Sequence, residues 1–200
     1  TESFYGSAPK LAIFNGCSLG GRQAITEAMR YPADYTGIIA GAPMIYTMQV
    51  HVARIALNAL AHRPPEGFIP KSKHAAVHDA VLNACDALDG LKDGVLENPL
   101  ACRFDPKALQ CTGADNVSCL TPPQVETMRE LYGPMKTGQA GTMPPLLQPG
   151  TELGWATLSG EEPVNTALEP MRYIVFKDPQ WTVSRFNLAT DFDRAMKADS

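Results

Sequence analysis

The sequence predicts an α/β fold for its first part, and three observations lead to this prediction. A short apolar run, LAIFNG from Leu11, has the length of a buried strand and ends at a glycine. The following segment, RQAITEAMRYP, carries apolar residues at helical spacing and stops before Pro32. TGIIAGAP then indicates a second buried strand. A strand, a tight turn, a helix and a strand form one βαβ unit of a parallel sheet.

Composition places the chain among globular proteins. The length of 200 residues predicts one domain or slightly more. With 44% hydrophobic and 19% charged residues, the chain should be globular. The net charge of −4 argues against a nucleic-acid partner. No apolar run approaches the roughly 20 residues of a membrane span, so we expect no membrane partner. The opening TESFYGSAPK does not resemble a signal peptide.

The character of the sequence changes near residue 45. Most of the 17 prolines follow this point, and no sustained βα alternation is found there. Two helices are predicted. One begins at Lys71, and the other has Thr121 as its N-cap, Pro122 in its first turn and Gly133 after its end. We expect the remainder to be an irregular, cross-linked insertion.

The five cysteines indicate an oxidised protein. They lie at positions 17, 85, 102, 111 and 119. An odd number leaves one cysteine unpaired within the chain, and the isolated position of Cys17 suggests that it is this one. The alternative is five reduced thiols packed as small apolar residues.

The turn between the first strand and the helix carries a Gly-x-Ser-x-Gly pattern, GCSLG. A serine nucleophile needs exposure on a strained turn, a neighbouring base and N–H groups aimed at the developing oxyanion. Gly16 and Gly20 would let the strand and the helix approach closely. We predict that Ser18 is a nucleophile and that the Leu19 N–H is its oxyanion donor. The alternative is a helix-capping serine.

The base and the acid that such a serine needs are not evident. The four histidines all lie in the irregular part, and none follows a strand. They are His51, His62, His74 and His78. The last two are spaced four residues apart, so they could share a helix face and bind a metal, but KSKHAAVHDA offers no evident third ligand. We expect a solvated helix face there.

A second motif is CDALDGLKDGVLENP, from Cys85 to Pro99. Asp86, Asp89 and Asp93 lie within eight residues, and two of them are followed directly by glycine. Such a loop can wrap a hard cation with carboxylate and carbonyl oxygens, and Ca²⁺ is the sensible candidate. The alternative is an Asx- and Gly-rich turn whose acids face water.

These motifs together resemble one family. GCSLGG, CDALDGLKDGV, the nearby CRFDP and then two further cysteines occur in the order found in the tannase and feruloyl esterase family. The resemblance implies an α/β-hydrolase core with a large lid inserted after the strand that follows the nucleophile turn. We therefore expect residues 1–44 to be part of the core and residues 45–200 to be a mostly irregular and helical lid, stabilised by disulfides and calcium.

The resemblance also assigns roles to individual residues. It makes Ser18 the nucleophile and places the Leu19 N–H in the oxyanion hole. The implied ligands of a structural Ca²⁺ are the side chains of Asp86, Asp89 and Asp93 and the carbonyls of Leu91 and Val95. The implied disulfides join Cys85 to Cys102 and Cys111 to Cys119.

In this family the cysteine before the serine pairs with a cysteine directly before the catalytic histidine. These 200 residues contain no cysteine beside a histidine. We therefore expect the partner of Cys17, together with the catalytic aspartate and histidine, to belong to the remainder of a longer hydrolase chain. On this expectation the chain is a fragment that is inactive alone, and the protein is secreted or periplasmic.

The activity that the resemblance implies is hydrolysis of aromatic esters of the feruloyl or galloyl type, through an acyl-enzyme. Trp155 could stack on a phenolic ring and Arg172 could meet a carboxylate, with Trp181, Tyr173 and Phe176 as further lid aromatics. The alternative is a non-catalytic, calcium-stabilised binding or structural module whose serine motif is idle.

Overall fold

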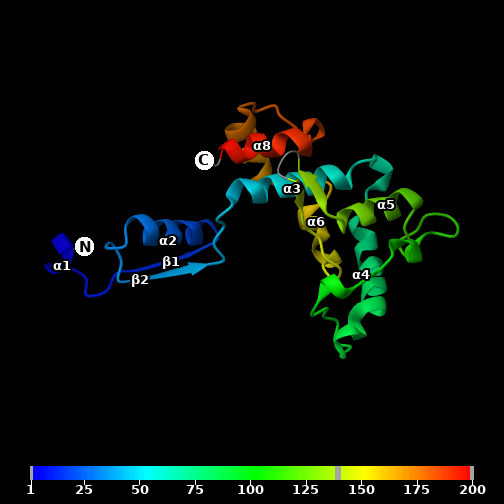
Figure 1. Cartoon of the computed structure of the whole chain (residues 1–200), viewed down its shortest axis with the longest axis horizontal. Helices are drawn as coiled ribbons and strands as arrows, with labels where there is room; N and C mark the ends of the chain where they lie inside the picture. The colour runs from blue at the N-terminus through cyan, green and yellow to red at the C-terminus, as the bar shows by residue number, and fades with distance from the viewer. Residues whose placement is uncertain (1, 138–140, 199–200) are drawn as a thin grey trace. The chain divides into compact units, whose positions relative to one another are not determined.

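The computed structural model describes residues 2–137 and 141–198 (Figure 1). The chain divides into two compact units, Thr1–Thr47 and Met48–Ser200, and each is described by itself. The first unit opens with a short helix, α1 (Glu2–Tyr5). The remaining elements of this unit form the α/β part of the molecule.

The first unit is built around two parallel strands. Strand β1 (Ile13–Cys17) pairs with β2 (Gly37–Gly41), so that Ile13 lies beside Gly37 and Cys17 beside Gly41. Helix α2 (Leu19–Arg30) connects them and runs along the two strands (Figure 1). This is the order of strand, helix and parallel strand that the sequence predicts.

The bounds of α2 follow from its sequence. The helix begins one residue after Ser18, and Gly21 and Ala24 form its buried side. It ends at Arg30, where the N–H of Tyr31 still donates to the Glu27 carbonyl and Pro32 follows. Proline restricts the preceding residue to extended backbone, so the helix cannot continue.

Large apolar side chains remain exposed in the first unit. Ile13 on β1 and Ile39 on β2 are 59% and 55% exposed, and Met29 on α2 is 78% exposed. Apolar surface is therefore exposed on both strands and on the helix.

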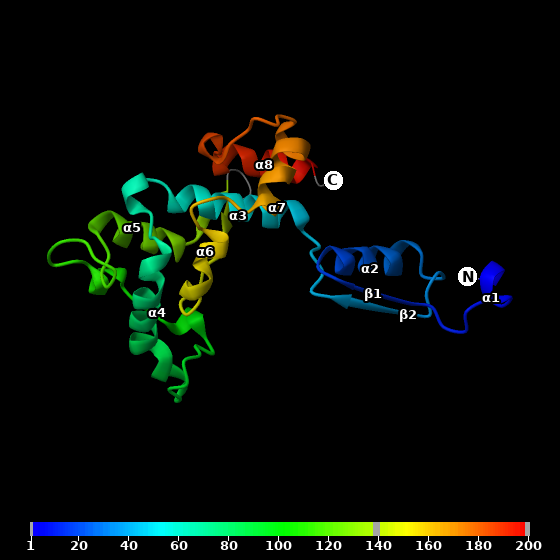
Figure 2. The same ribbon diagram turned by 180° about the vertical axis from the view of Figure 1, so that it is seen from behind.

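The second unit is mainly helical, as both views show (Figure 2). Its longer helices are α3 (Thr47–Ala61, whose first residue closes the first unit), α4 (Lys71–Cys85), α5 (Pro122–Leu131) and α8 (Leu188–Ala198). Its shorter elements include α6 (Trp155–Leu158), α7 (Asn165–Pro170) and the antiparallel strands β3 (Met135–Thr137) and β4 (Gly141–Met143). Among the described residues, no helix is long and apolar enough to cross a membrane.

The second unit has two hydrophobic clusters. One gathers side chains of α3, α7 and α8 around Trp181, which is 1% exposed. The other gathers α4 and α5 around Trp155, which is also 1% exposed. Helix α3 contributes Ile55 to the first cluster and Leu57 to the second. The unit is therefore held by a core of its own.

The predicted starts of α4 and α5 are confirmed. Helix α4 begins at Lys71. Helix α5 has a complete capping box, because Thr121 accepts from the N–H of Gln124 while the Gln124 side chain accepts from the N–H of Thr121. Helices α3 and α8, in contrast, were not predicted, and the second unit is more regular than the sequence suggested.

Two disulfide bonds are present. They join Cys85 to Cys102 and Cys111 to Cys119. The first links the end of α4 to the segment after the aspartate-rich loop. The second closes a nine-residue loop that leads into α5. Disulfides persist in oxidising compartments, which agrees with the oxidised protein that the cysteine content predicts.

Candidate functional site

Ser18 occupies the turn between β1 and α2, and it is exposed. Its backbone has φ 60° and ψ −115°. A positive φ is unfavourable for any residue with a Cβ, and such strain persists where the surroundings fix the backbone. A strained turn from a strand into a helix, with an exposed hydroxyl, is the geometry of a serine nucleophile.

Two glycines, Gly16 and Gly21, allow the turn to be this tight. The expectation for Gly20 is wrong, because a Cβ there would meet no heavy atom within 4 Å. A Cβ on Gly16 would lie 2.3 Å from the carbonyl oxygen of Gly20. A Cβ on Gly21 would lie 2.4 Å from the carbonyl oxygen of Gly41. Real Cβ atoms do not approach backbone so closely, so α2 rests on both strands only because these positions lack side chains.

The backbone of Ser18 is fixed by the last residue of β2 and by the segment that follows this strand. The N–H of Ser18 donates to the carbonyl of Gly41 at 3.0 Å, and the carbonyl of Ser18 accepts from the N–H of Met44 at 3.1 Å. The same carbonyl accepts from the N–H of Arg22 in the first turn of α2, at 3.0 Å. Every backbone polar group of Ser18 is therefore bonded.

The start of α2 supplies the electrostatics of the turn. Leu19 is the first helical residue, and the first N–H groups of a helix have no intrahelical acceptor. They carry the positive end of the helix dipole. The turn of Ser18 therefore lies at the positive end of the α2 dipole.

Cys17, directly before the serine, is a free and exposed cysteine at the end of β1. The other four cysteines form the two disulfides of the second unit. Cys17 is therefore the cysteine with a free thiol.

All four histidines lie in the second unit. His74 and His78 do share α4, but the expectation of a solvated helix face is wrong for His74, which is 5% exposed. Its Nε2 lies 3.1 Å from the carbonyl oxygen of Ile69, and its ring meets Trp155 edge-on. Burial lowers the pKa of His74.

His78 belongs to a buried polar cluster centred on Glu152. Its Nδ1 lies 2.8 Å from one carboxylate oxygen of Glu152, while the Tyr132 hydroxyl and the Gly150 N–H donate to the other. Glu152 has no exposed surface. Burial and the adjacent carboxylate raise the pKa of Tyr132, so its hydroxyl stays a donor. This cluster, which the sequence did not reveal, satisfies a buried charge.

The predicted calcium residues lie on an exposed loop after α4. Asp89 accepts from the N–H of Leu91 at 3.0 Å, and Asp93 accepts from the N–H of Val95 at 3.1 Å. Asp86 accepts from the N–H of Gly94 across the loop at 3.1 Å. In the part of the chain that the structure describes, the oxygens of these three carboxylates do not all lie within 4.8 Å of one another. Asp89 and Asp93 thus form Asx turns, and calcium binding by this loop stays a prediction.

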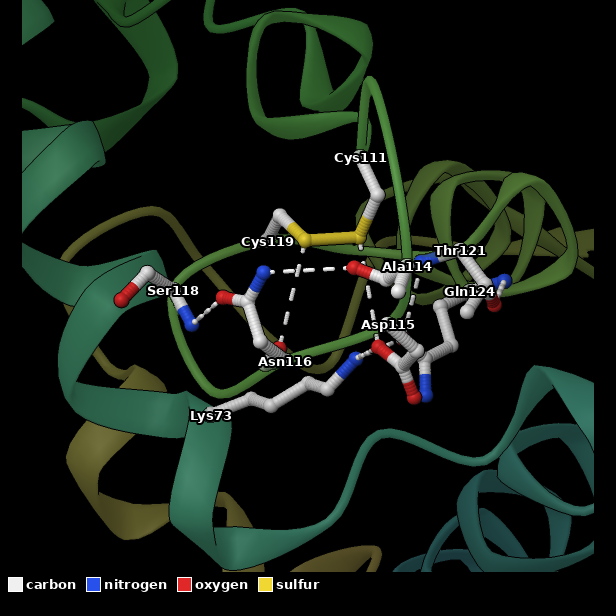
Figure 3. The surroundings of a disulfide bond; sticks show 9 residues. All are labelled: Lys73, Cys111, Ala114, Asp115, Asn116, Ser118, Cys119, Thr121 and Gln124. Atoms are coloured by element: carbon white, nitrogen blue, oxygen red, sulfur yellow. Dashed lines mark hydrogen bonds and ion pairs between the residues drawn. A yellow bond between two sulfur atoms is a disulfide. The ribbon is translucent and has the colours of Figure 1, made fainter.

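One group of three potential ligands does lie within 4.8 Å, namely Cys111, Asp115 and Cys119. Both sulfur atoms are used by the disulfide, so neither is a thiolate ligand. Asp115 forms an ion pair with Lys73, as Figure 3 shows. Lys73 also donates to Gln124 at 2.7 Å. This group does not fit a metal, and its one carboxylate pairs with the buried ammonium of Lys73.

The residues predicted to contact a substrate have other contacts in this structure. Trp155 is buried, and its indole N–H donates to Thr151 Oγ1 at 3.2 Å. Arg172 donates to the Trp181 carbonyl at 2.9 Å and pairs with Glu169 at 3.2 Å. Their assignment to a substrate site stays a prediction.

The chain is similar in sequence to fungal esterases. A probable feruloyl esterase B-2 from Aspergillus flavus is 36% identical over 191 residues, covering 94% of this chain and 36% of that protein. A probable feruloyl esterase B from Emericella nidulans is 33% identical over 197 residues, with the same coverage of 94% and 36%. The chain therefore spans little more than a third of the length of these relatives.

Solved structures agree with the sequence comparison. Feruloyl esterase B from Aspergillus oryzae matches with a TM-score of 0.83 and 30% identity, over 100% of this chain and 41% of that one. Tannin acyl hydrolase from Aspergillus niger matches with a TM-score of 0.64 over 100% of this chain and 39% of that one; at 19% identity it shows the fold alone. A family model described as tannase and feruloyl esterase matches residues 1–192. The chain belongs to the tannase and feruloyl esterase family.

Proposed function

We propose that this chain carries the nucleophile of a serine carboxylic-ester hydrolase whose substrates are aromatic esters of the feruloyl or galloyl type. One observation carries the proposal: Ser18 is exposed on a strained turn between a strand and a helix. The names of the relatives, which are feruloyl esterases, support the substrate class. The alternative role, a capping serine, is disfavoured because Ser18 makes no side-chain cap hydrogen bond to α2.

The proposed reaction is acyl transfer in two steps. The Ser18 oxygen attacks the ester carbonyl carbon while a base takes the hydroxyl proton, and the tetrahedral oxyanion is stabilised by the Leu19 N–H. Collapse of this intermediate breaks the bond to the alcohol, which leaves with that proton. Water then attacks the acyl-enzyme, releases the aromatic acid and restores the serine.

The base and the acid are proposed to come from the remainder of a longer hydrolase chain. The relatives are nearly three times as long as the matched region, since it covers 36% of them. Free Cys17 is proposed to form a disulfide with a cysteine that precedes the catalytic histidine, which would tie the nucleophile to its base. The exposed apolar side chains on β1, β2 and α2 offer a surface for the rest of such a core.

Residues 45–200 are proposed to form a lid, and the aspartate-rich loop is proposed to hold a structural Ca²⁺. The donor set consists only of carboxylate and carbonyl oxygens, which suits a hard cation. Four of the proposed ligands are exposed, namely Asp89, Leu91, Asp93 and Val95. The disulfide between Cys85 and Cys102 closes the loop. The ion would screen the repulsion between carboxylates. Two disulfides support a secreted or periplasmic location.

The test is the hydrolysis of methyl ferulate and methyl gallate by the protein purified from its source. Ser18→Ala should lower kcat at least about 10³-fold, because the covalent step is lost. Ser7→Ala, which changes another exposed serine of the first unit, is the matched control and should be as active as the wild type. Hydrolysis that survives Ser18→Ala would exclude Ser18 as the nucleophile.

A further inference from the structure

The strained turn of Ser18 is supported by a second strained segment. We name the residues from Gly41 to Met44 the strap. Within it, Ala42 has φ 38°, a positive value like the φ of 60° at Ser18, and a positive φ is uncommon for a residue with a Cβ. The two ends of the strap bond the N–H and the carbonyl of Ser18, at 3.0 and 3.1 Å. The conformation of Ser18 therefore depends on what holds the strap in place.

Thr47 and Arg22 hold the end of the strap. The Thr47 hydroxyl donates to the carbonyl of Met44 at 2.9 Å, and it accepts from Nη1 of Arg22 at 2.8 Å. A guanidinium can only donate, so the hydroxyl has to accept from it and direct its single proton to Met44. Thr47 is 8% exposed, so water competes little for these bonds.

These contacts close a ring of hydrogen bonds around the turn. The backbone N–H of Arg22 donates to the Ser18 carbonyl, which also accepts from Met44; the Met44 carbonyl accepts from Thr47, and Thr47 accepts from the Arg22 side chain. Arg22 therefore takes part in this ring twice, through its backbone N–H and through its guanidinium. A charge-assisted bond such as that from Arg22 is stronger than one between neutral groups.

We propose that Arg22 and Thr47 are positioning residues, which hold the strap and thereby keep the Ser18 hydroxyl in its reactive orientation. This inference rests on the proposed nucleophile role of Ser18. Neither side chain needs to touch the substrate, because both act through the backbone of the strap. A displacement of a reacting group by about 1 Å can cost on the order of 10²-fold in rate, so a loosened strap should slow the chemical step.

The test compares two isosteric substitutions in the full protein. Thr47→Val removes the hydroxyl that links Arg22 to Met44. Thr36→Val removes a hydroxyl that accepts from the Ala12 N–H at the opposite end of the strands, and it is the matched control. Thr47→Val should lower kcat about 10- to 100-fold with KM changed less than twofold, while Thr36→Val should keep wild-type kcat. Thr47→Ser keeps the hydroxyl and should restore kcat to within threefold of the wild type.

A second readout follows the turn itself. Hydrogen exchange of the Ser18 amide, which donates to Gly41, should be at least tenfold faster in Thr47→Val and unchanged in Thr36→Val. If Thr47→Val does not fold, Arg22→Met, which keeps the length of the stem and removes the donor, should show the same loss of kcat and of amide protection.

The inference is overturned if Thr47→Val has wild-type kcat and Ser18 protection, or if Thr36→Val shows an equal loss. Ser18→Ala separates this outcome from failure of the proposed function. A Ser18→Ala variant that remains active refutes the nucleophile, whereas an inactive Ser18→Ala beside a fully active Thr47→Val refutes only the positioning role.

Discussion

His78 Nδ1 lies 2.8 Å from a carboxylate oxygen of Glu152, a side chain with no exposed surface. These residues are 74 positions apart, on α4 and directly before α6. Tyr132, after α5, donates to the same carboxylate. The contact therefore joins three segments of the second unit through one acceptor.

Removal of this acceptor should be costly. Glu152→Ala leaves the donors of Tyr132 and Gly150 without a partner in a buried place, and we expect a loss of about 3 kcal/mol in the free energy of unfolding. Glu162→Ala, at an exposed position, should change it by less than about 0.5 kcal/mol. Urea unfolding of both variants measures the difference. Equal stabilities would show that the cluster does not stabilise the fold.

The ion pair of Lys73 and Asp115 predicts how three substitutions rank in their loss of stability. Lys73 is 4% exposed, and Asp115→Ala leaves its ammonium without this counter-ion, at a cost of about 2 kcal/mol. Lys73→Met removes the buried charge and leaves a solvated carboxylate, so it should cost less. Glu126→Ala, which breaks an exposed pair with Arg129, should cost below about 1 kcal/mol. Thermal unfolding ranks the three variants, and a larger loss in Lys73→Met would contradict this account.

His74 predicts a dependence of stability on pH. Burial lowers its pKa in the folded state below the ordinary 6.5, so near and below pH 6.5 the unfolded chain binds a proton that the folded chain does not. The free energy of unfolding should therefore be fully retained above pH 6.5 and decrease as the pH falls below it. The decrease should be smaller in His74→Gln. Parallel pH profiles of the wild type and the variant would exclude His74 as the cause.

Calcium should stabilise the second unit if the aspartate-rich loop binds it. We expect millimolar Ca²⁺ to raise Tm, and Asp89→Asn to remove most of this shift, because a neutral amide is a weaker ligand than a carboxylate. Asp79→Asn, at an exposed position of α4 outside the loop, is the control and should keep the shift. A Tm that does not respond to Ca²⁺ or to a chelator would exclude the site.

The local features of the fold could be predicted from the sequence. The strand, turn and helix around GCSLG, the start of α4 at Lys71 and the Thr121 cap of α5 could each be predicted from neighbouring residues. Helix α3 was missed because it is apolar on nearly all sides, with Val52, Ile55 and Leu57 all buried, and so lacks an amphipathic stripe. Helix α8 does have such a stripe, with buried Phe192 and Ala195, and this signal could have revealed it.

The long-range contacts of the site could not be predicted in the same way. Glu152 lies in a segment, TELGW, in which nothing marks it as buried, and its partners come from α4 and the end of α5. The ring around Ser18 likewise depends on Thr47, 29 positions from the serine, whose hydroxyl carries no local signal of its role. Side-chain pairs of this kind are determined by the packing of whole elements.

The nucleophilic role of Ser18 is tested most directly by mass spectrometry of the protein from its source after treatment with a fluorophosphonate. The account predicts one adduct, on the Ser18 oxygen, with loss of ester hydrolysis in proportion to labelling, protection by an aromatic ester, and no adduct in Ser18→Ala. An adduct on another residue that accompanies the loss of hydrolysis, or hydrolysis that continues in fully labelled protein, would contradict it.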